Sequence, residues 1–262
     1  MRLTGKHVVI TGASSGIGAQ IALKVAGQGA TPVMLARSEE KLTTVCENIK
    51  NVTGVDALPY KLDVSDASAV SAVFDRVLDR LGTIDVLVNN AGFGVFDLFH
   101  EADIDEAKRM LDVNVLGVMA CTRKLLPHFL VRNSGHILNI ASLAGKVATP
   151  KSAVYSATKH AVVGFSNALR LELAGTNIYV TTVNPGPVET HFFGIADPSG
   201  EYVKNVASFM LAPEQVAEKV AAAIGKRKRE INVPFSMNVG ARLYQMFPSV
   251  LDSLVGKWMN KK

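Results

Sequence analysis

The chain has 262 residues, of which 48% are hydrophobic and 19% charged, with a formal net charge of +5. This composition excludes a disordered or fibrous protein, and the charge excess is too small to predict a nucleic-acid partner. No apolar signal segment opens the chain and no stretch reaches the roughly 18 apolar residues of a membrane span, so we expect a cytoplasmic protein. Cys46 and Cys121 form no CxxC motif, which is typical of free thiols in a reducing compartment.

Short apolar runs behind turn residues predict seven β-strands. In chain order they are 7–10, 31–35, 55–62, 84–88, 136–140, 178–183 and 230–234. The segments between them carry apolar residues at steps of three and four, which predicts amphipathic helices. Alternating strands and helices favour a single α/β domain over residues 1–262, with a parallel sheet and helices on both faces.

The glycine-rich stretch 11–18, TGASSGIG, joins the first predicted strand to a helix expected from about Gly16 to Gln28. In such a connection Gly12 permits the tight turn, Gly16 lets backbone N–H groups face phosphates, and Gly18 allows close helix packing. The motif predicts a pyrophosphate-binding turn, although a tight connection without a ligand would show the same glycines.

The second strand ends at Arg37 and Ser38, where a cofactor with free ribose hydroxyls is usually met by an acidic residue. The guanidinium of Arg37 instead matches a 2′-phosphate, and Ser38 can cap the helix that follows. This pair predicts NADP rather than NAD. The alternative is that Arg37 is a solvated loop residue.

Tyr155 and Lys159 stand four residues apart, on one face of a predicted helix. A neighbouring cation favours the phenolate and brings the pKa of a tyrosine toward the range useful for acid–base catalysis. Ser142 follows the fifth predicted strand, where its hydroxyl could polarise a carbonyl oxygen. Each feature alone also fits a surface pair or a turn. The six histidines show no metal-binding spacing, so we predict no metal.

In their joint order these motifs resemble the short-chain dehydrogenase/reductases, over roughly residues 5–190. The motifs are TGASSGIG at 11–18, Asp63-Val64, Asn89-Asn90-Ala91-Gly92, Asn114, Ser142, Tyr155 with Lys159, and Pro185-Gly186 with Thr190. The resemblance implies a Rossmann sheet in the order 3-2-1-4-5-6-7 and hydride transfer between a nicotinamide and a carbonyl or alcohol carbon. It makes 5–190 the cofactor-binding and catalytic core and leaves 186–262 for the substrate loop and C-terminal helices. Ala141 departs from the second serine of many relatives.

The resemblance also implies roles for individual residues. Tyr155 would donate the proton, Ser142 would hold the substrate oxygen, and Asn114 would anchor a water in the proton relay, with Lys159 also binding the nicotinamide ribose. The implied cofactor contacts are Gly12, Ser14, Ser15, Gly16, Ile17, Gly18, Arg37, Ser38, Asp63, Val64, Asn90, Ala91, Gly92, Tyr155, Lys159, Pro185, Gly186, Val188 and Thr190.

Apolar residues dominate the segments expected to wall the substrate cleft. These are Phe93, Val95, Phe96, Leu98 and Phe99 after the fourth strand, and Phe192, Phe193, Ile195, Tyr202, Val203, Phe209, Met210 and Leu211 after the sixth. They predict an NADP-dependent carbonyl reductase for a lipophilic ketone or secondary alcohol, steroid-like or acyl. The alternative is a catalytically idle dinucleotide sensor or a membrane-associated scaffold on the same fold.

The C-terminal segment 239–259 carries an apolar stripe. Its members are Leu243, Met246, Phe247, Val250, Leu251, Leu254, Val255 and Trp258. Pro248 should end one helix near Phe247 and begin another. The stripe is expected to cover the cleft or a neighbouring subunit, or else to form a peripheral membrane anchor flanked by basic residues. The basic run 226–229 is interpreted as the solvated end of a helix beginning near Pro213, with contact to a phospholipid or polyanion as the alternative.

Two predicted helices, 103–131 and 152–174, carry more apolar and small residues than one buried face needs. They are Val113, Val115, Leu116, Val118 and Met119, and Ala157, Ala161, Val162, Val163 and Phe165. Such surfaces suit a two-fold pair of helices, and the family resemblance implies a homodimer or homotetramer.

Overall fold

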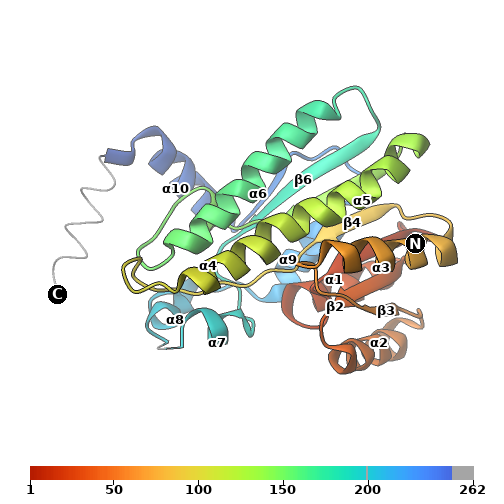
Figure 1. Cartoon of the computed structure of the whole chain (residues 1–262), viewed down its shortest axis with the longest axis horizontal. Helices are drawn as coiled ribbons and strands as arrows, with labels where there is room; N and C mark the ends of the chain where they lie inside the picture. The colour runs from red at the N-terminus through yellow and green to blue at the C-terminus, as the bar shows by residue number, and fades with distance from the viewer. Residues whose placement is uncertain (199, 250–262) are drawn as a thin grey trace.

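The computed structural model describes residues 1–198 and 200–249, which form a parallel seven-stranded sheet in the order β3-β2-β1-β4-β5-β6-β7 (Figure 1). The strands are β1 His7–Thr11, β2 Thr31–Ala36, β3 Leu58–Lys61, β4 Val86–Asn89, β5 Gly135–Ile140, β6 Ile178–Pro185 and β7 Glu230–Val233. The predicted number of strands, their order and the α/β fold are all confirmed.

Helices cover both faces of the sheet. The long ones are α1 Gly16–Ala26, α2 Glu39–Thr53, α3 Ala67–Leu81, α5 Gly117–Arg132, α6 Ala153–Glu172, α9 Pro213–Ala223 and α10 Phe235–Met246. The short ones are α4 Ile104–Leu111, α7 Phe192–Ala196 and α8 Glu201–Val206, together with η1 Asp112–Leu116, η2 Leu143–Gly145 and η3 Ala207–Phe209. No helix in the described part of the chain is both long enough and apolar enough to span a bilayer.

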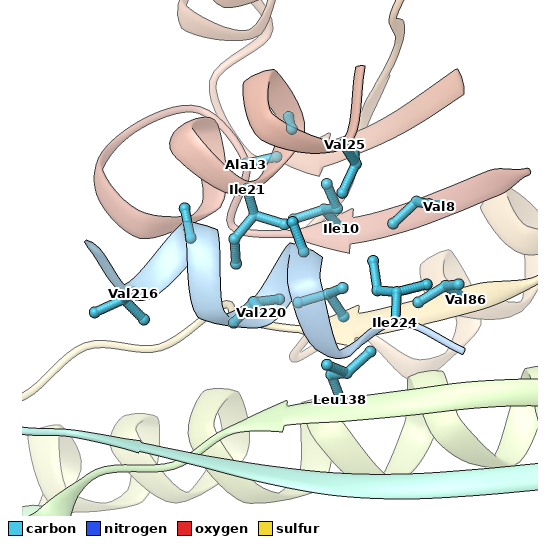
Figure 2. Close-up of a cluster of buried hydrophobic side chains, with 14 of the residues drawn as sticks. Val8, Ile10, Ala13, Ile21, Val25, Val86, Leu138, Val216, Val220 and Ile224 are labelled. Atoms are coloured by element: carbon cyan, nitrogen blue, oxygen red, sulfur yellow. The ribbon is translucent and has the colours of Figure 1, made fainter. Parts of the chain in front are cut away.

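Two apolar cores lie on opposite faces of the sheet because successive strand residues point in opposite directions. Val8 and Ile10 of β1 pack with α1, α2 and α9, whereas Val9 packs with α3, α5 and α6. Figure 2 shows part of the first core, where α9 and α1 pack together against β1. This packing fixes the carboxyl ends of the strands relative to the helices that follow them.

Two strands begin later than the apolar pattern predicts. β3 begins at Leu58 rather than at Val55, because Gly54 ends α2 with a positive φ and the chain needs a few residues to reach the sheet. β4 begins at Val86 rather than at Ile84, whose backbone N–H donates to His128 Nε2 at 3.2 Å.

The basic run 226–229 lies beyond α9 and not at its end. The helix stops at Ala223, and Gly225 with a φ of +77° turns the chain toward β7. The guanidinium of Arg227 lies 5.6 Å from the Tyr179 ring centroid, and Arg229 donates to Asn167 at 2.9 Å. The run therefore lies just past the helix rather than in its last turn. All four side chains are exposed, as the solvated interpretation expects, and Arg227 and Arg229 also contact neighbouring elements.

The apolar residues that predict an oligomer divide into three groups by their burial. Val115, Val118 and Val162 are buried within this chain, so they are unavailable to a partner. Leu116 is 55% exposed, and Ala157 is exposed on the neighbouring helix α6. The half-buried residues are Val113, Met119, Ala161, Val163 and Phe165. The homodimer or homotetramer stays a prediction, which now depends on the exposed and half-buried residues.

Candidate active site

A cleft of about 1300 Å³ opens where the strands end. Its lining begins at the turns after β1 and β2 and continues through the segments after β3, β4, β5 and β6 to α7, α8 and α10. All the predicted site residues line it except Gly18 and Asn114. Ligands of open parallel sheets bind at this edge, so the sequence motifs converge on one site.

Gly12 and Gly18 shape the first turn in different ways. Gly12 has a φ of +64°, and a Cβ there would lie 2.8 Å from the Cα of Ala91. A Cβ on Gly18 would lie 2.3 Å from the carbonyl oxygen of Gly12. Gly18 therefore serves packing beneath the turn, as predicted, and leaves the start of α1 free to face the cleft.

Asn90 and Thr11 hold this turn against β4. The amide of Asn90 donates to the carbonyl oxygens of Thr11 at 3.0 Å and Gly12 at 3.1 Å. The Thr11 hydroxyl oxygen accepts from the backbone N–H groups of Asn90 and Ala91, both at 3.0 Å. Thr11 is missed as a positioning residue by sequence reasoning, although it is the first residue of the glycine motif.

The end of the cleft beside β2 and α2, which we expect to hold the adenosine of a cofactor and call the adenosine end, contains two cationic side chains. Arg37 and Ser38 line it as predicted, and Lys41 from the first turn of α2 lines it beside them. The Ser38 hydroxyl oxygen accepts from the backbone N–H of Lys41, which confirms its capping role. Sequence reasoning missed Lys41, whose position one helical turn after the cap was the available signal.

Asp63 lines the same end of the cleft. Partial burial acts to raise its pKa, but hydrogen bonds from Ser65 and the charge of Arg37 outweigh burial and leave the pKa below its usual value. Ser65 donates to the Asp63 carboxylate from its backbone N–H at 3.0 Å and from its hydroxyl at 2.7 Å. These bonds keep the carboxylate ionised and fix its orientation.

Asn114 lies in η1, a π-helical segment between α4 and α5. Its side chain is buried, accepts from the N–H of Phe93 at 3.0 Å, and donates to the carbonyl oxygen of Phe93 at 2.8 Å and to Thr158 at 3.1 Å. Thr158 in turn donates to the carbonyl oxygen of Tyr155 at 2.7 Å. Asn114 therefore links the wall of the cleft to the helix that carries Tyr155.

Tyr155 and Ser142 meet at the centre of the cleft. Ser142 follows β5 and its hydroxyl oxygen accepts from the N–H of Ala144 at 3.1 Å. Burial raises the pKa of the Tyr155 phenol above its usual value, while a hydrogen bond with Ser142 acts in the opposite direction. The expectation that Lys159 brings this pKa down is wrong here, because burial dominates and keeps the phenol protonated.

Lys159 lies one turn after Tyr155 and is 5% exposed. Its ammonium donates to the carbonyl oxygen of Ile140 at 3.1 Å and lies 5.7 Å from the Tyr155 ring centroid. Burial lowers the pKa of Lys159 to about 8. At neutral pH the side chain therefore stays charged, at a cost to stability.

Replacing Lys159 by methionine is expected to stabilise the ligand-free chain at pH 7 while removing activity. The shift from an ordinary pKa of 10.5 to about 8 corresponds to about 3 kcal/mol, reduced by about 1 kcal/mol for the lost hydrogen bond. Between pH 8 and 10.5 the unfolded state holds the proton that the folded state has released, so the stability of the unchanged chain rises with pH. Thermal unfolding of both proteins at pH 7 and pH 9.5 measures this effect. The difference in stability between Lys159→Met and the unchanged chain should become smaller at pH 9.5, and a constant difference would contradict the lowered pKa of Lys159.

The end of the cleft expected to hold the substrate is an aromatic chamber formed by Phe96, Phe192, Phe193 and Tyr202. The ring centroid of Phe96 lies 5.7 Å from that of Tyr155, 6.1 Å from that of Phe192 and 5.1 Å from that of Tyr202. Of the predicted wall residues, seven line the cleft: Phe93, Phe96, Phe192, Phe193, Ile195, Tyr202 and Phe209. The prediction is wrong for Val95, Leu98, Phe99, Val203, Met210 and Leu211.

The excluded residues have identifiable other positions. Val95 and Phe99 line a separate small pocket near α4, and Leu98 is 40% exposed. Leu211 is buried and pairs with Val188 in a short parallel bridge. Alternate residues of an extended loop face opposite ways, so one apolar segment could not send every side chain into the cleft.

Helix α10 covers the cleft with a face that the sequence pattern misassigned. Met237, Gly240, Ala241 and Tyr244 line the cavity, one to two turns apart. The predicted stripe faces outward instead: Leu243, Met246 and Phe247 are 50%, 68% and 55% exposed. α10 ends at Met246, just before Pro248, as predicted, and the second predicted helix falls mostly outside the described residues.

Histidine, cysteine and carboxylate side chains in the described residues form no group of three or more that could hold a metal ion. Buried Cys121 and partly buried Cys46 are free thiols.

Comparison with known proteins agrees with this site. The sequence profile of the short chain dehydrogenase family matches residues 6–198, so the chain belongs to this family of oxidoreductases. It is 38% identical over 237 residues to the NADP-dependent 3-hydroxy acid dehydrogenase of Schizosaccharomyces pombe, covering 88% of this chain and 91% of the relative.

Two solved structures extend the likeness. A short chain dehydrogenase/reductase from Burkholderia phymatum in complex with NAD superimposes with a TM-score of 0.86, at 28% identity and 96% of each chain. A variant of the actinorhodin polyketide ketoreductase with NADPH gives a TM-score of 0.79 at 35% identity, covering 87% of this chain and 95% of that one. Similar folds thus hold either cofactor, and the choice depends on local residues.

Proposed function

We propose that this protein is an NADP(H)-dependent oxidoreductase that interconverts a lipophilic ketone and its secondary alcohol. The observation that carries the proposal is the meeting of Tyr155, Ser142 and Lys159 at the centre of one cleft, between a glycine turn and an aromatic chamber. Chemistry, cofactor and substrate are supported by different parts of this cleft.

The nicotinamide cofactor, when bound, supplies or accepts the hydride. Ser142 donates a hydrogen bond to the substrate carbonyl oxygen, and Tyr155 transfers its phenolic proton to that oxygen as negative charge develops there. At neutral pH the Tyr155 phenol holds its proton in the ligand-free chain, so the group that would donate it is in the protonated form. The charge of Lys159 favours the phenolate that remains after transfer.

The cofactor preference rests on Arg37 and Lys41. Both line the adenosine end of the cleft, where a 2′-phosphate would carry about two negative charges. The glycine turn fits a pyrophosphate, because side chains at Gly12 and Gly18 would collide with backbone. The NADP-dependent relative and the NADPH-bound ketoreductase support the same choice.

The substrate preference rests on the aromatic chamber around Phe96. Among the described residues that line the cleft, the lysines and arginines are Arg37, Lys41 and Lys159, and none of them belongs to the chamber. A substrate carboxylate in the chamber would lose hydration without a cationic partner. A hydroxy acid like that named for the fission yeast relative is therefore the less favoured substrate. The alternative of a catalytically idle dinucleotide sensor is also less favoured, because it does not explain why Tyr155, Ser142 and Lys159 converge.

A homologous series of alkyl ketones tests the lipophilic chamber. We expect kcat/KM to rise roughly fourfold per added methylene until the cleft is filled, because each buried CH₂ contributes about 0.8 kcal/mol. Initial rates of NADPH oxidation give this dependence directly. Matched 3-keto acids serve as the comparison: a flat dependence for the ketones, or a clear preference for the acids, would overturn the substrate assignment but not the reductase chemistry.

A further inference from the structure

Lys146 is a nearly buried cation outside the catalytic group. It follows η2, the short helix capped by Ser142, and its side chain is 8% exposed. The ammonium donates to Glu230 Oε2 at 2.6 Å and to Asn232 Oδ1 at 3.0 Å, both on β7. It also reaches Asn238 Oδ1 on α10 at 3.5 Å.

A second hydrogen bond joins the same two segments. The side-chain amide of Gln245 in α10 donates to the backbone carbonyl oxygen of Lys146 at 3.3 Å. Asn238 and Gln245 lie two turns apart, so α10 is attached to the segment after Ser142 at two points along its length. The face of α10 between these points carries Gly240, Ala241 and Tyr244, which cover the cleft.

Stability alone does not account for this cluster. A buried ion pair loses hydration, and apolar side chains of similar volume usually stabilise a fold equally well. Asn184 and Asn238 are also buried, and Asn184 donates to Asn232 Oδ1 at 2.9 Å. A buried polar network with directional bonds instead specifies one relative placement of the elements that it joins.

We propose that Lys146 is a positioning residue that fixes α10 against the Ser142 segment and thereby sets the size and selectivity of the substrate end of the cleft. The expected effect of Lys146 on substrate selectivity rests on the proposed reductase function. Its expected effect on the placement of α10 does not depend on that function. Lys146 touches neither the adenosine end nor Tyr155, so cofactor affinity and the proton-transfer step should not depend on it.

The first test measures α10 itself in the full chain. Amide hydrogen exchange over residues 235–246 should become at least about tenfold faster in Lys146→Met, while the strands keep their protection. Lys146→Arg should restore most of the protection because it keeps the charge. Asn238→Leu gives a milder route to the same effect if Lys146→Met folds poorly.

Lys24→Met is the matched control, since Lys24 also joins two elements through an ion pair, with Glu218 at 2.7 Å, but lies away from the cleft. Unchanged exchange in α10 for both Lys146→Met and Asn238→Leu would overturn the proposal. Acceleration spread evenly over the whole chain would also overturn it, because that result means a general loss of stability.

The second test is kinetic. Lys146→Met should raise KM for the longest ketone of the alkyl series by about tenfold and flatten the chain-length dependence, with kcat for the shortest ketone within about twofold. NADPH affinity, measured by fluorescence titration, should stay unchanged. An equal loss of kcat for all ketones would contradict positioning of the substrate end. Absence of any ketone reduction by the unchanged protein would count against the proposed function and leave the exchange test to decide the role of Lys146.

Discussion

Replacing Tyr155 by phenylalanine is expected to lower turnover by about 10²–10⁴-fold, the usual contribution of a general acid. The change removes the transferable proton and almost no volume, so the ring contact with Phe96 should persist. Cofactor fluorescence should show an NADPH dissociation constant within about twofold of the original value. Steady-state rates with saturating ketone measure the loss.

Tyr202→Phe is the matched control for this prediction. Tyr202 lines the same cleft and its ring contacts Phe96, but it lies in α8 and not in α6, the helix that carries both Tyr155 and Lys159. We expect its removal to change turnover only slightly. If Tyr155→Phe retained most of the original rate, or if both variants lost it equally, Tyr155 would not be the proton donor.

Replacing Arg37 by aspartate should reverse the cofactor preference. A charge-assisted bond to the 2′-phosphate contributes on the order of 1.5–3 kcal/mol, so NADPH affinity should fall by about 10- to 150-fold. The new carboxylate can accept from free ribose hydroxyls, which should improve NADH binding. Fluorescence titration with the two cofactors measures both effects.

Two further variants sharpen the cofactor prediction. Lys41→Gln should weaken NADPH binding alone, by less than Arg37→Asp, because Lys41 lines the same end of the cleft. Arg80→Asp places the same charge change on an exposed arginine in the last turn of α3 and should leave both affinities unaltered. Equal affinities of the original protein for NADPH and NADH would show that Arg37 is only a solvated residue.

The sheet was predictable because most of its strands are apolar on both faces and its helices are amphipathic. The predicted starts of two strands were wrong because local backbone geometry decides where a strand begins. Val55, for example, is apolar but belongs to the loop after Gly54 and not to the strand. Apolar character alone does not show where hydrogen bonding between strands begins.

The candidate site divides in the same way. Residues that belong to a sequence motif, such as Gly12 and Tyr155, were identified from their residue types and spacing. Residues that act through tertiary contact, such as Thr11 and Lys146, could not be, because their partners lie 79 or more positions away in sequence. The raised pKa of Tyr155 was missed for a related reason, since burial is a property of the assembled cleft.

The C-terminal helix shows how a correct pattern can give the wrong face. The apolar residues of α10 lie on two sides of the helix, one with Leu243 and Met246 and the other with Met237 and Ala241. The sequence pattern alone does not show which side faces the cleft. Only the second stripe faces the cleft, and the buried Asn238 between its members marks the side that faces protein. Because the other stripe is exposed, contact with a neighbouring subunit and peripheral membrane contact both stay predictions for it.

Hydride transfer itself is tested with NADPH that carries deuterium at both positions of its reactive nicotinamide carbon. With a medium-chain alkyl ketone, we expect mass spectrometry to find the corresponding secondary alcohol with deuterium on the carbinol carbon, and Tyr155→Phe to form almost none under the same conditions. Firm NADPH binding without any labelled alcohol, across short and long ketones alike, would contradict the assignment and favour an idle dinucleotide-binding protein.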